Sequence, residues 1–141
     1  MIINAERTQS YSLYTKKGKE PLIFQFEEVK LGILICRDQN DPMLAREYKT
    51  SEADAIFILS AHFYEPIEAI RKLNKNRALP IARAVENNLF VKANAVGSNN
   101  NKISLGGSLI IDPGGFIIHE GNNIDEMVLS YDISKRKKPR D

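Results

Sequence analysis

The sequence predicts an α/β fold, and three observations support this prediction. Residues 29–35 and 55–59 are short, almost continuous apolar runs, which are typical of strands covered on both faces of a parallel sheet. Residues 65–88 space their apolar side chains as one face of a helix does. From residue 89 onward, short apolar segments alternate with turn residues, so a region rich in strands follows. Strands that alternate with helices before such a region indicate an α/β sandwich.

The first strands are expected to form a hairpin that leads to a short helix. Residues 22–26 alternate apolar side chains with others, and an acidic pair at 27–28 supplies a turn into the run 29–35. Farther along, Asp41 and Pro42 predict a helix start, with Asp41 as the cap and Pro42 at the first helical position.

The longer helix, at residues 65–88, contains Pro80. Proline donates no backbone hydrogen bond and clashes with the preceding turn, so we expect it to break or kink this helix. After the helix, the sequence predicts a polar loop at 98–102 and strands that begin at residue 89 and span residues 109–111, 116–118 and 127–131.

Composition excludes several classes of protein. The 141 residues suit one domain, and 43% hydrophobic with 27% charged residues is typical of a globular chain. A net charge of +2 gives no reason to expect a nucleic-acid or membrane partner, and no apolar stretch approaches the about 20 residues that span a bilayer. One cysteine forms no intrachain disulfide, and no export signal is visible, so we expect a cytoplasmic protein. One cysteine and two histidines show no zinc-ligand spacing, so no metal site is predicted.

Cys36 lies where the run 29–35 ends and a helix start approaches. A side chain at such a position is exposed at the sheet edge, near backbone N–H groups that stabilise a thiolate or a developing oxyanion. This placement is typical of a nucleophile. The alternative from the residues alone is a buried structural cysteine that packs as a small apolar side chain.

Five segments, in order over residues 30–133, resemble motifs of the carbon–nitrogen hydrolase (nitrilase) superfamily. The string Gly32-Ile-Leu-Ile-Cys36-Arg-Asp38 is similar to the nucleophile segment of that family. The other similar segments are Pro42 with Arg46; Ala53-Asp54 with the strand ending at Ser60-Ala61; Arg83 to Val91 with Ala93-Asn94 and Gly97; and Gly107-Ser108 with Ile111-Asp112-Pro113 and Gly115.

The resemblance implies an αββα sandwich that is incomplete at its N-terminus in this chain. We expect one partial domain over residues 1–141, family-like over about 20–133, with a basic tail at 134–141. The tail is interpreted as a solvated end, with a nucleic-acid-binding arm as the alternative. Half a sandwich leaves one sheet face uncovered, so we expect a homodimer or a complementing N-terminal segment as partner.

The resemblance also implies hydrolysis of a non-peptide carbon–nitrogen bond in a small amide, carbamoyl compound or nitrile, without a cofactor. Cys36 attacks the carbon as a thiolate, ammonia or an amine leaves, and water resolves the thioester. The backbone N–H of Arg37 is expected to stabilise the oxyanion. His62 and Phe63 follow the strand 55–59, at the end where α/β folds place ligands, and are expected to form a pocket wall, with loop packing as the alternative.

The sequence departs from the family pattern upstream of Cys36. The family's general-base glutamate and its oxyanion-stabilising lysine both precede the cysteine, and no matching motif is found there. Lys16 and Glu6 are the alternatives within the chain, but the sequence from Lys17 onward is more similar to a later turn of the family. Met43 also replaces a family glutamate. We therefore expect the chain alone to be nearly inactive.

Other polar residues near these motifs are expected to support the structure. Glu86 and Asn87 are predicted to make buried hydrogen bonds, Asp38 to serve as a cap or turn residue, and His119 to be structural on a late strand. His62 remains an alternative base for Cys36, although the family assigns that role to a carboxylate.

Three interpretations therefore stay open. The first is a cysteine-dependent hydrolase of non-peptide carbon–nitrogen bonds. The second is a non-catalytic remnant or interaction module of the same fold. The third is an unrelated α/β hydrolase with its cysteine on a strand-to-helix turn, in which His62 is the base.

Overall fold

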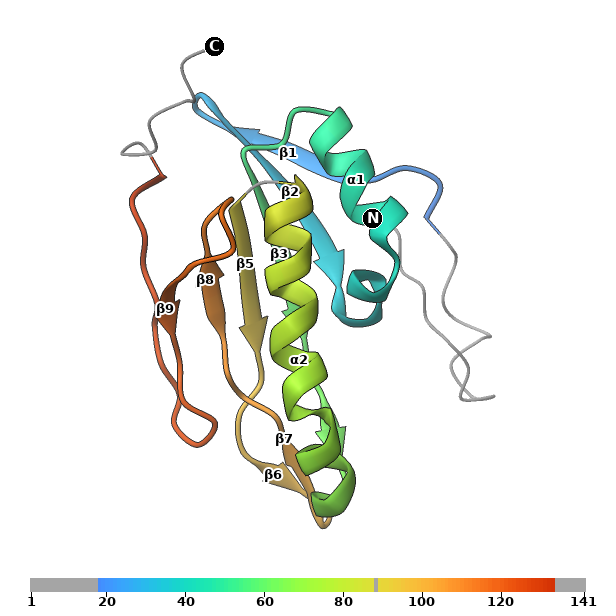
Figure 1. Cartoon of the computed structure of the whole chain (residues 1–141), viewed down its shortest axis with the longest axis vertical. Coiled ribbons are helices and arrows are strands. Elements are labelled where there is room, and N and C mark those ends of the chain that lie inside the picture. The colour runs from blue at the N-terminus through green and yellow to red at the C-terminus, as the bar shows by residue number, and fades with distance from the viewer. Residues whose placement is uncertain (1–17, 88, 134–141) are drawn as a thin grey trace.

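The computed structural model describes residues 18–87 and 89–133. The described chain forms a mixed sheet, a second small sheet and helices (Figure 1). In chain order, the elements are β1 (Leu22–Phe26), β2 (Val29–Ile35), the 3-10 helix η1 (Cys36–Asn40), α1 (Pro42–Thr50), β3 (Ala55–Ser60), β4 (Phe63–Tyr64), α2 (Pro66–Asn87), β5 (Leu89–Asn94), β6 (Ser98–Asn99), β7 (Lys102–Ser104), β8 (Leu109–Ile111) and β9 (Ile117–Glu120).

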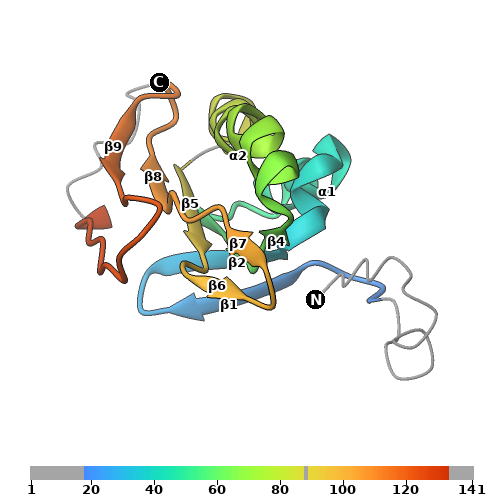
Figure 2. The ribbon, with the colours of Figure 1, turned by 90° about the horizontal axis from the view of Figure 1, so that it is seen from below.

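The main sheet has six strands in the order β1-β2-β3-β5-β8-β9. Its centre, β2, β3 and β5, is parallel, whereas β1 and the β8–β9 hairpin add antiparallel strands on either side. Helices α1 and α2 both lie on one face of this sheet (Figure 2). The three-stranded sheet β4-β7-β6 lies beside the first turns of α2. The α/β prediction, the first hairpin and both helices are confirmed.

The helix-covered face of the sheet holds the main core, which includes Leu34, Ile56 and Ile58. Tyr48 of α1 lies directly over Gly32 of β2, where an added Cβ would be 2.3 Å from the Tyr48 Cδ1 atom. The Tyr48 hydroxyl also donates a hydrogen bond of 2.5 Å to the Ile33 carbonyl. Glycine at this position therefore allows α1 to pack against β2 just before Cys36.

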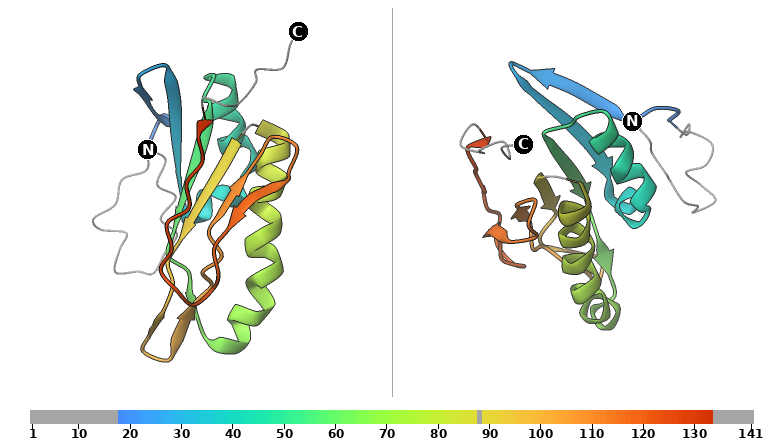
Figure 3. Two further views of the ribbon diagram at one scale, coloured as in Figure 1. Left: turned by 90° about the vertical axis from the view of Figure 1, so that its left-hand side faces the viewer. Right: turned by 45° about the horizontal axis from the view of Figure 1, so that its top comes forward.

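The opposite face of the sheet is only half-buried. The prediction that the strands are covered on both faces is therefore confirmed for the helix-covered face and only in part for the other. Leu31, Phe57 and Val91 pack there with Leu129 from the C-terminal part of the described chain. The stretch 127–131 is not a strand, contrary to prediction, and runs as irregular backbone along the sheet (Figure 3). The side chain of Leu129 packs onto the sheet face, but the backbone of this stretch does not pair with a strand.

Helix α2 continues through Pro80, so the expected break does not occur. Proline 80 offers no N–H to the carbonyl of Asn76, four residues earlier. Lys92 of β5, only 1% exposed, fills this role, since its Nζ donates to the Asn76 carbonyl at 2.8 Å and also to the Asn76 side-chain Oδ1. A buried lysine from the sheet thus satisfies the carbonyl that the proline leaves open.

The buried polar residues near the end of α2 are Arg83 and Asn87, whereas Glu86 is exposed. Asn87 is buried as predicted, and its Nδ2 donates to the Arg83 carbonyl at 2.9 Å. Glu86 is exposed, contrary to prediction, because its place in the helical turn points outward. The Arg83 guanidinium reaches it at 2.6 Å and also donates from Nε to the Gln39 carbonyl at 3.1 Å. Arg83 therefore ties α2 to η1.

The predicted polar loop at 98–102 is instead the hairpin of β6 and β7. Asn100 and Asn101, the two residues between the strands, have φ angles of 45° and 64°. This conformation is typical of the tight turns that join antiparallel strands, and asparagine adopts it more readily than most residues. In the described part of the chain, no helix is long and apolar enough to cross a membrane.

Candidate active site

The C-terminal ends of the three parallel strands meet at one edge of the sheet. Cys36 follows β2 directly, and His62 follows β3 after one intervening residue. Asn94, the last residue of β5, pairs with Ser60 of β3 at the same edge. Open α/β sheets commonly bind ligands at this edge, because loops there diverge and leave a crevice.

Cys36 adopts an unusual backbone conformation, with a φ angle of 46°. Non-glycine residues seldom occupy this left-handed region, and they are held there at a cost of about 1–3 kcal/mol by the surrounding structure. Asp38, which is 1% exposed, supports the turn, since its Oδ2 accepts a hydrogen bond of 3.0 Å from the Ile35 N–H. Asp38 is thus the turn residue that the sequence predicts. Hydrolases often present their nucleophile on such a strained strand-to-helix turn.

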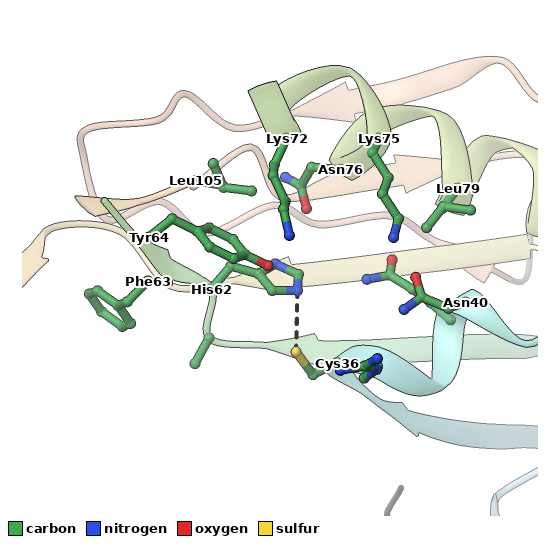
Figure 4. A pocket seen from close by; sticks show the side chains of 13 residues that line it. Cys36, Asn40, His62, Phe63, Tyr64, Lys72, Lys75, Asn76, Leu79 and Leu105 are labelled. Atoms are coloured by element: carbon green, nitrogen blue, oxygen red, sulfur yellow. Dashed lines mark hydrogen bonds between the residues drawn. The ribbon is translucent and has the colours of Figure 1, made fainter. Parts of the chain in front are cut away.

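The imidazole of His62 lies against the thiol of Cys36 (Figure 4). The distance from Cys36 Sγ to His62 Nε2 is 3.2 Å, which is within hydrogen-bond range for sulfur. Burial, together with the positive charges of Lys92 and Lys72, lowers the pKa of His62 from 6.5 to about 4. The ring is therefore neutral at neutral pH. In one neutral tautomer its Nε2 accepts from the thiol, and in the other it donates to a thiolate.

Cys36 opens into a pocket of about 390 Å³, a volume that suits a small-molecule ligand. Side chains from η1, from the segment after β3 and from α2 surround it, and Lys72 and Lys75 point into it from α2 (Figure 4). Among the described residues, no Asp or Glu lines it. The lining residues are Cys36, Arg37, Gln39, Asn40, Ala61, His62, Phe63, Tyr64, Lys72, Lys75, Asn76, Leu79 and Leu105.

Stacked side chains form one wall of the pocket. The rings of His62 and Tyr64 lie 5.9 Å apart, centre to centre, at an interplanar angle of 21°. The ammonium of Lys72 lies 4.7 Å from the centre of the Tyr64 ring, a cation–π contact. Burial raises the pKa of the Tyr64 phenol, so this ring stays neutral. Along this wall, the Cys36 thiol contacts the imidazole of His62, the imidazole stacks on the ring of Tyr64, and the ring contacts the ammonium of Lys72.

The structure brings together the four residues that the sequence singles out for the site. Cys36, Arg37, His62 and Phe63 all line the same pocket, with Phe63 37% exposed. Lys16 and Glu6 lie outside the described residues. His119 is exposed on β9 and is not among the lining residues.

Sequence reasoning missed the contribution of α2 to the pocket. Lys72, Lys75 and Asn76 line it, and they are spaced three and four residues apart on one face of the helix. This spacing was the available signal. It gave no indication on its own, because a polar helix face is most often exposed to solvent.

Comparisons with known proteins agree on the family. The sequence profile of the carbon-nitrogen hydrolase family matches residues 3–137. The 2-oxoglutaramate amidase of Bacillus subtilis is 39% identical over 117 residues, which is 82% of this chain and 43% of that protein. The deaminated glutathione amidase of Dictyostelium discoideum is 33% identical over 77% of this chain and 36% of that protein. The chain thus spans less than half the length of these relatives.

A solved structure shows the same fold. A mutant amidase from Nesterenkonia sp. AN1 superposes with a TM-score of 0.72 at 20% identity, over 86% of this chain and 45% of that one. That structure is described as showing covalent addition of the acetamide moiety of fluoroacetamide at its active-site cysteine. At this identity, the likeness supports the fold alone. The profile match over nearly the whole sequence shows that the chain belongs to the carbon-nitrogen hydrolase family.

Proposed function

We propose that this chain carries the nucleophile of an enzyme that hydrolyses amides, with Cys36 as that nucleophile. The observation that carries the proposal is the strained turn at Cys36, which presents the thiol to a pocket beside His62. Family membership supports carbon–nitrogen bond hydrolysis as the reaction class. The relative at 39% identity is named as an amidase, whereas one at 33% identity is named as a probable nitrilase, so the more similar relative favours amides as substrates.

The proposed reaction proceeds in two steps. The Cys36 thiolate attacks the amide carbon, a C–S bond forms, and the carbonyl electrons move to oxygen. As this intermediate collapses, the C–N bond breaks, and the amide nitrogen takes up the proton that the base removed from the thiol and leaves as ammonia. Water then hydrolyses the remaining thioester to a carboxylic acid and frees the Cys36 thiol. We propose that the Arg37 backbone N–H stabilises the oxyanion, and that His62 and Phe63 form the pocket wall around the substrate.

The base that accepts the thiol proton is proposed to be a carboxylate outside the described residues. Residues 18–87 and 89–133 place no Asp or Glu in the pocket lining. A protonated imidazole at His62 is disfavoured by burial and by Lys92 and Lys72, whereas a negative group would complement those charges. We therefore propose that His62 orients the thiol. Because no motif matching the family's base precedes Cys36, we also propose that the 141-residue chain alone turns over amides very slowly.

The experiment is an ammonia-release assay on a panel of small primary amides. The chain is compared with its Cys36→Ala variant, and with a longer product if coding sequence in the same frame lies upstream. We expect little release by the chain alone and Cys36-dependent release once the missing base is supplied. Turnover by the chain alone would show that the base lies within it. A longer product with no Cys36-dependent release would indicate a non-catalytic remnant or interaction module.

A second candidate is a Cys–His hydrolase in which His62 is the general base. The distance of 3.2 Å between Cys36 Sγ and His62 Nε2 favours it. In that case His62→Gln should lower turnover by roughly 10²–10⁴-fold, the usual contribution of a general base. The matched control is His119→Gln, which changes the histidine on β9 away from the pocket lining. If His62 only orients the thiol, its replacement should cost much less.

A further inference from the structure

The pocket beside Cys36 gathers positive charge, and no Asp or Glu is among its described lining residues. Lys72 and Lys75 enter it from α2, and Arg37 lines it from η1 (Figure 4). Lys92 lies buried behind Asn76, which also lines the pocket. A cleft lined by charges of one sign attracts small ions of the opposite sign, because its low-dielectric walls concentrate the field.

Contacts on the pocket wall hold Lys72 in place. Its ammonium lies above the ring of Tyr64, which itself stacks on His62 beside Cys36. Glu68 pairs with Lys72 at 3.1 Å from the same helix, but both side chains are substantially exposed, so solvent weakens this pair. The ring of Tyr64 therefore lies between the positive charge of Lys72 and the His62 imidazole that contacts the thiol.

The field of the lysines extends to the reacting end of the pocket. After burial, the charges of Lys92 and Lys72 are the largest influences that lower the pKa of His62. His62 lies in hydrogen-bond contact with Cys36, so the same field acts where a substrate carbonyl would lie. An amide that carries a carboxylate would give Lys72 an ionic partner inside the pocket, beyond its exposed pair with Glu68, whereas a neutral amide would not.

We infer that this pocket selects amides that carry a carboxylate, which Lys72 and Lys75 hold while the amide carbon lies against Cys36 Sγ. The inference rests on the proposed function, because it names the substrate class of the same site. The two lysines are three residues apart on α2, so their ammonium groups approach the pocket from the same side. They are specificity-determining residues and take no part in bond breaking.

The test compares two thiol reagents of nearly equal size, anionic iodoacetate and neutral iodoacetamide. In each, the Cys36 sulfur forms a C–S bond, the C–I bond breaks, and iodide leaves. The rate constant for iodoacetate is divided by that for iodoacetamide in the folded chain. This ratio is then divided by the same ratio measured in urea, where the pocket is lost. We expect this quotient to be roughly fivefold or more above one, and to fall with added salt, as field effects do.

Variants then locate the charge responsible for the preference. Lys72→Met and Lys75→Met should each lower the iodoacetate preference, and the double variant should abolish it. Arg71→Met is the matched control, because Arg71 is an exposed cation on the same helix but does not line the pocket. A quotient near one, or an equal effect of the Arg71 control, would overturn the inference.

A binding measurement covers the case of a thiol too slow to alkylate. Succinamate and the neutral butyramide are titrated into the Cys36→Ser variant and followed by NMR. We expect succinamate to bind roughly tenfold more tightly, and Lys75→Met to remove the difference. Equal or undetectable binding of both would refute the inference. Fast reaction with iodoacetamide but no preference for iodoacetate would refute only the charge selectivity and leave the proposed nucleophile intact.

Discussion

Replacing Lys92 with methionine separates two opposing effects of the buried amine on stability. Burial lowers the pKa of Lys92 from 10.5 to about 8. At about 1.4 kcal/mol per pKa unit, the protonated amine therefore costs about 3 kcal/mol on folding. Methionine removes this cost, but it also leaves the Asn76 carbonyl without the hydrogen bond that Lys92 donates. An orphaned buried carbonyl costs about 1–3 kcal/mol, so the net change at neutral pH should be a gain of about 0–2 kcal/mol.

A double-mutant cycle with Pro80→Ala isolates the carbonyl. Alanine at position 80 supplies the N–H that proline lacks, so Asn76 recovers its helical hydrogen bond. In this background, Lys92→Met should stabilise the chain by about 3 kcal/mol, because only the cost of the buried charge is removed. The expected coupling between the two sites is thus about 1–3 kcal/mol. Urea denaturation of the four proteins, with equal m-values as the check on two-state behaviour, measures it.

The pH dependence provides an independent check. Between about pH 8 and 10.5 the unfolded Lys92 keeps its proton while the folded one loses it, so wild-type stability should rise with pH across this window. In Lys92→Met this contribution is absent, and the difference between the two curves should change by about 3 kcal/mol. Parallel stability curves for the two proteins would refute the buried charge at Lys92. A coupling energy near zero would refute its hydrogen bond to the Asn76 carbonyl.

Three further predictions concern packing, protonation and association. Gly32→Ala should lower the free energy of unfolding, measured in urea, by about 1–3 kcal/mol, because the added Cβ would overlap the ring of Tyr48. Gly121→Ala is the control, since its Cβ would meet only ordinary contacts at 3.7 Å and should change stability little. Equal losses in the two variants would contradict this reasoning. Wild-type stability should fall as pH drops from about 6.5 towards about 4, because His62 stays neutral when folded and is protonated when unfolded; His62→Gln should lose this component and His119→Gln should not. Light scattering should show self-association through the half-buried sheet face, weakened by Leu59→Glu at its 42% exposed position; a monomer at high concentration would argue against it.

Local pattern determined the parts of this protein that depend on neighbouring residues. Apolar runs identified β2 and β3, and Asp41 with Pro42 located the start of α1, where the Asp41 side chain accepts the Met43 N–H at 2.9 Å. The resemblance of five short segments, in order along the chain, to motifs of one family predicted the family to which the chain belongs. These signals are short in range, so one sequence suffices to read them.

Tertiary structure decided what depends on contacts between distant residues. Pro80 is tolerated because Lys92, from another element, supplies the hydrogen bond that the helix lacks. The sequence of the stretch 127–131 predicts a strand, but in the structure only Leu129 of this stretch packs onto the sheet face, and no strand pairing forms. His62 meets Cys36 only because β2 and β3 are parallel neighbours that end at one edge. The lysines of α2 reach the pocket because that helix crosses the same edge, which helical periodicity alone does not reveal.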